Sequence, residues 1–169
     1  MSMVGLFWIT GTAAHIGAPP NEPGPGVLLT EEGLTGLGAD QGGRWTWDGI
    51  RRVSVVGAPV RSSVGRAAGL LLDTVITAAF GGVDDGPAMF VRVETPTEEV
   101  ELTVYAPTAF YGPAECRLSQ DLLDAYVDGR ATPAALLDWG RTQQGRTPKR
   151  AEREELLAAW GGTPRRPGR

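Results

Sequence analysis

Ala88-Met-Phe-Val-Arg-Val-Glu-Thr95 and Val100-Glu-Leu-Thr-Val-Tyr105 are the two stretches that decide the fold. In the first stretch Met89, Val91 and Val93 alternate with Phe90, Arg92 and Glu94, and the second alternates in the same way. Successive side chains of a strand point to opposite faces, so this pattern predicts two strands with one buried face. Pro96-Thr-Glu-Glu99 between them is typical of a turn. The two stretches are therefore expected to form an antiparallel hairpin.

Five shorter β-prone segments precede this hairpin, and three helical segments follow it. The strands are expected near residues 4–10, 27–30, 34–38, 44–47 and 51–56. The first helix is expected from Pro113 to Asp128, because Pro suits its first position and Gly129 suits its end. Thr132-Pro133 and Thr147-Pro148 predict two more helix starts, each with Thr as N-cap and Pro at the first position.

Seven short antiparallel strands cannot leave their edges open and stay monomeric. The sequence therefore predicts an α+β fold: a seven-stranded antiparallel barrel or sandwich whose open end is capped by the helix of residues 113–128.

Two segments carry a resemblance to a known family. Leu28-Leu-Thr-Glu-Glu-Gly-Leu34, followed by Trp45-Thr-Trp47-Asp-Gly-Ile50-Arg-Arg-Val53, resembles the pattern of bacterial PH-like (pleckstrin-homology-like) domains. The resemblance implies a PH-like domain over residues 1–128 with an insertion at 57–87. Residues 129–161 would then be a helical extension, and residues 162–169 a disordered tail.

The insertion holds an apolar segment that we expect to be a helix, although part of it also suits a strand. As a helix, residues 64–80 place Val64, Ala68, Leu71 and Val75 on one side. Thr74-Val-Ile-Thr77 is equally typical of a strand. If this segment is an exposed apolar helix, homodimerisation is the simplest way to cover it.

The composition excludes several kinds of site. With one cysteine, Cys116, and one histidine, His15, the chain can form neither an internal disulfide nor a Cys/His zinc cluster. The glycine-rich stretches fit neither the dinucleotide fingerprint nor the Walker loop. The start of the chain lacks the basic region of a signal peptide, and no apolar stretch is long enough to span a membrane. A cytoplasmic protein without catalytic residues, metal or cofactor is expected.

Phosphoinositide-binding PH domains hold headgroups with Lys and Arg around the first strand and its loop. Here the loop from Gly17 to Gly26 has no basic residue, so headgroup binding at that site is not expected.

A non-enzymatic interaction or scaffolding module that binds an unidentified protein is the expected function, and neither nucleic acid nor membrane is an expected partner. Arginines could receive an acidic partner, and apolar or aromatic side chains could anchor one. The candidate binding residues are Arg51, Arg52, Arg61, Arg66, Leu70, Ile76, Phe80, Trp139 and Trp160.

Two alternatives stay open. One is a small-ligand binder or enzyme that uses an unrecognised pocket lined by His15, Asp73 or Arg92. The other is binding to an anionic surface through residues 141–169, which carry eight basic against three acidic side chains, whereas the whole chain has a net charge of −4.

Overall fold

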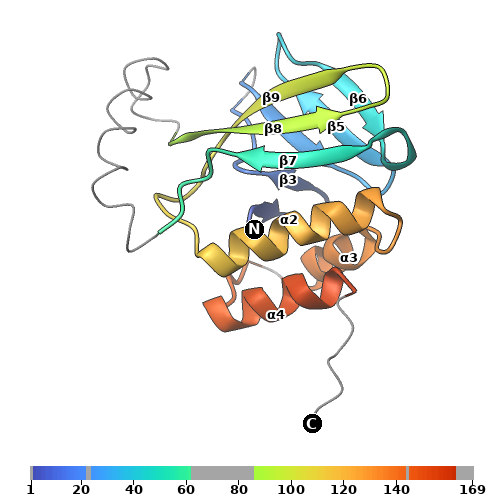
Figure 1. Ribbon diagram of the computed structural model, residues 1–169. Helices are drawn as coiled ribbons and strands as arrows, with labels where there is room; N and C mark the ends of the chain where they lie inside the picture. Colours follow the sequence, from blue (N-terminus) through green and yellow to red (C-terminus); the bar gives the residue numbers. More distant parts are fainter. Residues whose placement is uncertain (1, 22–23, 62–85, 144, 163–169) are drawn as a thin grey trace.

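The computed structural model describes residues 2–21, 24–61, 86–143 and 145–162 (Figure 1). Its described residues form two antiparallel sheets and three α-helices. The first sheet is a six-stranded meander in chain order: β1 (Ser2–Val4), β2 (Phe7–Ile9), β3 (Ala14–Ile16), β4 (Gly26–Leu29), β5 (Gly33–Leu37) and β6 (Gly43–Thr46). The second contains β7 (Arg52–Val56), β8 (Ala88–Glu94) and β9 (Glu99–Tyr105). A short 3-10 helix, η1 (Trp47–Gly49), joins the two sheets.

The α+β class with antiparallel sheets is confirmed, but the predicted strand count is wrong, and of the two expected arrangements, barrel or sandwich, the barrel is not formed. The described part of the chain has nine strands in two separate sheets, not seven in a closed barrel. The single strand expected at residues 4–10 is instead part of a β1–β2 hairpin over residues 2–9, because Gly5 adopts a φ of 57° that permits the turn between the two strands. Ala14–Ile16 adds a strand that the sequence pattern did not reveal.

The β8–β9 hairpin has the predicted alternation. Met89, Val91 and Val93 are buried, and Leu102 and Val104 of β9 are buried on the same face. This face packs with the inner residues of the six-stranded sheet, such as Phe7 and Ile16, in one hydrophobic core. The helices contribute to the same core, which extends to Leu136 and Leu157.

The helices cover the side of the core beneath β7 (Figure 1). They are α2 (Pro113–Val127), α3 (Ala134–Thr142) and α4 (Arg150–Trp160). Helix α2 begins at Pro113 as predicted, and Gly129 follows its end with a φ of 71°. The predicted Thr caps of the other two helices are wrong. Pro133 and Lys149 occupy the N-cap positions of α3 and α4, and neither helix has a side-chain cap.

Glutamine side chains occupy both outer edges of the three-stranded sheet. The Gln120 amide on α2 donates to the carbonyl of Val53 (2.6 Å) and accepts from the N–H of Val55 (3.2 Å). The Gln41 amide donates to the carbonyl of Thr103 (2.9 Å) and accepts from its N–H (2.8 Å). The open edge of a sheet presents unpaired N–H and C=O groups. The two glutamine amides therefore supply hydrogen-bond partners to some of these groups on β7 and β9. Gln41 also bonds the carbonyl of Gly26, which ties the two sheets together.

Several expectations fall on residues outside those described. They are the helix or strand at 64–80, the candidate residues Arg66, Leu70, Ile76 and Phe80, and the tail from residue 163 onward. Within the described ranges, no helix combines the length and hydropathy needed to cross a membrane.

Candidate functional site

A groove lies where β2, the connection after β3 and the end of β9 meet. It has a volume of about 690 Å³. The lining residues are aromatic, proline or small, with one amide side chain. They are Trp8, Ala18, Pro19, Pro20, Asn21, Gly24, Pro25, Gly86, Tyr105, Ala106 and Pro107.

Strand alternation places Trp8 toward this groove. Its neighbours Phe7 and Ile9 are buried in the core, so the indole between them lies on the opposite face of β2. The far side of the groove is fixed by backbone bonds from the N–H of Ala18 to the carbonyl of Tyr105 (2.7 Å) and from the N–H of Ala106 to Pro87 (2.8 Å).

Prolines make the lining stiff. Four of the eleven lining residues are proline, and each proline ring fixes φ near −65°. Pro20 also packs closely on Gly26, because a Cβ added to that glycine would lie 2.8 Å from the proline Cδ. A segment bound here therefore meets a surface that loses little conformational entropy on binding.

Two buried ring nitrogens on β2 and β3 lack hydrogen-bond partners among the described residues. They are Nε1 of Trp8 and Nδ1 of His15, and both are shielded from solvent. Trp8 and His15 lie directly opposite each other in the β2–β3 pair. Burial lowers the pKa of His15 from its usual 6.5, which favours the neutral ring. A buried donor without an acceptor costs free energy, so the Trp8 N–H favours a ligand that brings an acceptor.

The groove suits an uncharged, largely apolar segment that offers carbonyl oxygens. Among the described lining residues there is no Lys, Arg, Asp or Glu, so a charged ligand would gain no ion pair from them. Grooves with aromatic side chains in their walls bind extended, proline-rich peptides in several kinds of domain.

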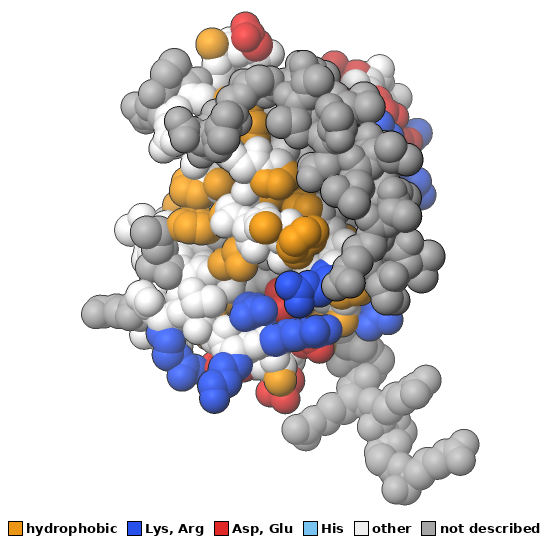
Figure 2. Space-filling view, turned by 90° about the vertical axis from the view of Figure 1, so that its left-hand side faces the viewer, with side chains coloured by type: hydrophobic (Ala, Val, Ile, Leu, Met, Phe, Trp, Pro, Cys, Tyr) orange, Lys and Arg blue, Asp and Glu red, His pale blue; other side chains and the backbone are white. Residues whose placement is uncertain are grey.

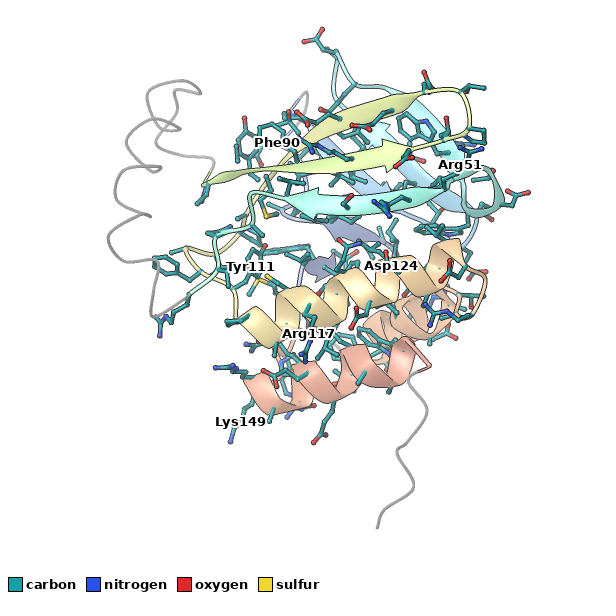
Figure 3. All side chains as sticks on the ribbon, in the orientation of Figure 1. Arg51, Phe90, Tyr111, Arg117, Asp124 and Lys149 are labelled. Atoms are coloured by element: carbon teal, nitrogen blue, oxygen red, sulfur yellow. The ribbon has the colours of Figure 1, made fainter. Side chains whose placement is uncertain are left out.

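The structure separates the three arginine candidates that it describes. Arg51 and Arg52 are exposed at the beginning of β7. Arg61 follows the other end of that strand, where its N–H donates to the carbonyl of Tyr111 (3.1 Å). In Figure 3, Arg51 and Tyr111 lie at opposite ends of β7. These arginines therefore do not form a single cluster.

Trp139 and Trp160 are brought together. Their rings meet edge to face, with centroids 5.7 Å apart, and join α3 to α4. Trp160 is buried and Trp139 is half-buried, so this contact packs one helix on the other.

Two of the residues expected to line an alternative pocket, His15 and Arg92, lie in different sheets, on β3 and β8. Arg92 is exposed on β8 and forms an ion pair with Glu101 of β9 (2.9 Å). Asp73 lies outside the described residues.

The pKa values of Cys116 and Tyr111 are both raised, which makes these side chains less reactive at neutral pH. Burial raises the pKa of the Cys116 thiol to about 11, and the Glu115 carboxylate adds to the shift. Burial likewise raises the pKa of Tyr111, with smaller effects from Cys116 and Glu115. The thiol therefore remains protonated at neutral pH. Among the described residues, no group of three or more His, Cys, Asp or Glu side chains is arranged to hold a metal ion.

The groove was not predicted, although two signals in the sequence bear on it. Trp8 alternates with apolar core residues, and the loop from Gly17 to Gly26 combines four prolines with no basic residue. The sequence alone does not show that this loop lies against residues 105–107.

Comparisons with known protein families, with curated proteins and with solved structures found no match to this chain. The resemblance to PH-like domains therefore stays a hypothesis.

Proposed function

We propose that this chain is a non-enzymatic interaction module with a PH-like architecture, and that its groove binds an extended, uncharged segment of a partner protein. The observation that carries the proposal is the buried N–H of Trp8, which has no acceptor among the described residues, in the wall of a groove lined by prolines.

The chemistry of the groove defines the segment that would fit. A backbone carbonyl of the bound segment would accept a hydrogen bond from Trp8 Nε1 once the indole turns toward the groove, because this nitrogen is shielded from solvent in the free chain. Apolar or proline side chains would lie against Tyr105 and the lining prolines. Proline-containing segments are already extended, so they lose less conformational entropy than a flexible chain when they bind.

The PH-like part of the proposal rests on the two sequence segments that carry the resemblance. Residues 28–34 lie in β4, β5 and the turn between them, and residues 45–53 cover the end of β6, η1 and the start of β7. Trp47 joins these segments to α2. Its Nε1 donates to the carbonyl of Thr30 (3.2 Å), and its ring lies 5.3 Å from that of Tyr126. Two antiparallel sheets covered by a helix are consistent with the hypothesis, although the nine strands of the described residues exceed the expected seven.

A small apolar molecule is the second candidate ligand. The groove volume of about 690 Å³ is within the range of small-molecule sites. We favour a peptide segment because the Trp8 N–H needs an acceptor such as a backbone carbonyl, which a purely apolar molecule does not offer.

The test is selection from a library of random linear peptides on the full chain, followed by affinity measurements. Peptides selected on the wild type should bind the Trp8→Phe variant about tenfold more weakly, because the ring remains while the N–H donor is lost. Trp139→Phe is the matched control, since Trp139 packs on Trp160 instead of lining the groove.

Two results would count against this function. One is that no peptide is enriched on the wild type. The other is that selected peptides bind Trp8→Ala as well as they bind the wild type. If a small-molecule screen alone yields ligands that depend on Trp8, the second candidate replaces the first.

A further inference from the structure

Large apolar side chains are exposed on both sides of the backbone pairing between residues 60 and 111. Among the described residues, Val56 and Val60 are each 38% exposed and Phe110 is 58% exposed. Val60 pairs with Tyr111 in a parallel bridge, so Val60 and Phe110 belong to adjacent segments. Grouped exposure of this kind typically marks an interaction surface.

Basic side chains border these apolar residues. The guanidinium of Arg61 lies 5.9 Å from the centre of the Phe110 ring. The Arg150 side chain lies against Gly112, since a Cβ at that glycine would be 3.6 Å from Nε of Arg150. Arg117 and Lys149 lie toward the N-terminal ends of α2 and α4, on the same side as Tyr111 (Figure 3). Figure 2 shows apolar side chains gathered above a band of Lys and Arg on this face.

The local charge is positive although the chain as a whole carries −4. Arg61 and residues 113–117 and 146–154 together hold six basic and three acidic side chains. Each of the three carboxylates forms an ion pair within the group: Glu115 with Arg153, Glu152 with Arg146, and Glu154 with Arg150. Arg61, Arg117 and Lys149 have no carboxylate partner among the described residues, and all three are exposed. We call these three residues, together with Val60 and Phe110, the basic face.

We propose that the basic face binds an acidic segment of a partner protein, with an apolar side chain of that segment placed on Phe110. This inference rests on the proposed function, because the same partner could occupy the groove. The chain from Tyr105 in the groove to Phe110 spans at most about 18 Å. One extended peptide can therefore contact both surfaces, with its uncharged part in the groove and its acidic part on the basic face.

Charge complementarity favours an acidic protein segment over a nucleic acid or a membrane. The binding of a nucleic acid depends on how many of its phosphates the protein neutralises. Three unpaired cations beside three carboxylates would neutralise few phosphates, so they would bind a phosphate backbone weakly. Membrane recruitment typically uses clusters of about four to eight basic residues. Acidic side chains spaced along a peptide can instead meet Arg61, Arg117 and Lys149 individually, and the exposed aromatic ring supplies an apolar contact.

The test uses a fluorescent peptide of alternating Asp and Glu with a central Phe, and a counterpart with Asn and Gln in place of the acids. Fluorescence anisotropy measures the binding of both to the full chain. The acidic peptide should bind at least about tenfold more tightly than its neutral counterpart, and added salt should weaken it. The double variant Arg117→Glu/Lys149→Glu should lose about tenfold in affinity. Arg51→Glu/Arg52→Glu is the matched control, because it makes the same charge change at the far end of β7.

Phe110→Ser provides a variant without a charge change. It should weaken the acidic peptide, and thermal unfolding should show that the variant is folded. The inference is overturned if the neutral peptide binds equally well or if the control variant loses as much affinity as the test variant. It is also overturned if single-stranded DNA or phosphatidylserine vesicles bind the same residues more tightly than the acidic peptide. If the library peptides need Trp8 but bind Arg117→Glu as well as the wild type, the groove proposal stands and the basic-face proposal falls. If they need Arg117 but bind Trp8→Phe as well as the wild type, only the groove proposal falls.

Discussion

Arg153 of α4 holds the buried carboxylate of Glu115 of α2 through its Nε and Nη2 atoms. The nitrogen–oxygen distances are 3.1, 3.1 and 2.6 Å, and the side chains of Glu115 and Arg153 are only 3% and 18% exposed. Arg153 also donates to the carbonyl of Pro148 (2.8 Å), directly before the helix to which it belongs. This ion pair fixes the packing of α4 on α2, and with it the geometry of the basic face.

Replacement of Arg153 by Met should destabilise the protein strongly. The Glu115 carboxylate would remain buried without its cation, and breaking a buried pair in this way costs about 3–5 kcal/mol. Urea unfolding measures the loss. Arg150→Met, which breaks an exposed pair with Glu154 one turn away, should change stability little. Equal losses for the two variants would show that the Glu115–Arg153 pair has no special role.

Gln120→Ala should lower the free energy of unfolding by about 1–3 kcal/mol, because the N–H of Val55 and the carbonyl of Val53 would lose their partner. Gln120→Glu keeps the size and the acceptor but removes the donor to Val53. It also places a carboxylate beside Asp124, which now accepts from the amide (3.0 Å). Gln120→Glu should therefore not restore stability. A Gln120→Ala protein as stable as the wild type would contradict a role for this amide at the edge of β7.

His15 should make stability depend on pH. Burial lowers the pKa of the folded-state imidazole below the usual 6.5, so the unfolded chain binds the extra proton first as pH falls. The His15 contribution is therefore fully present above pH 6.5 and decreases as pH falls through that value toward the lower folded-state pKa. In denaturant titrations at a series of pH values, His15→Gln should flatten the curve in this window. An unchanged curve would show that the imidazole is not desolvated.

Cys116 should react slowly with thiol reagents in the folded protein. Its pKa of about 11 leaves very little thiolate at neutral pH, and thiolate is the reactive form. The rate of iodoacetamide modification should rise with pH toward about 11 and increase strongly when the chain is unfolded. In the folded protein, Glu115→Gln should raise the rate because it removes the negative charge that adds to the shift. Fast modification of the folded wild type at neutral pH would contradict the burial of this thiol.

Patterns within one segment predicted the elements of the fold well. Alternation in residues 88–105 gave the β8–β9 hairpin because both strands bury a single face. Pro113 and Gly129 gave the bounds of α2 because each residue has a strong conformational preference. The β1–β2 hairpin was missed, since Gly5 lies inside an apolar run that resembles one continuous strand.

The functional surfaces depend on contacts that no local pattern contains. Trp8 meets residues 105–107 only because β9 ends beside the connection that follows β3. Arg61 and Phe110 come together through the pairing of Val60 with Tyr111, across about fifty positions of sequence. Arg61 itself was a candidate from the sequence. The contact of Arg61 with Phe110 and its distance from Arg51, by contrast, depend on the tertiary structure.

The most direct measurement is the indole N–H resonance of Trp8 in a two-dimensional nitrogen–proton NMR spectrum, recorded while a library-selected peptide is added to the full chain. The peak is assigned by its loss in Trp8→Phe. A hydrogen bond to a peptide carbonyl predicts a downfield shift of this peak that saturates with the same affinity as binding, while the Trp139 indole peak stays in place. A peptide that binds fully without moving the Trp8 peak would contradict binding in the groove.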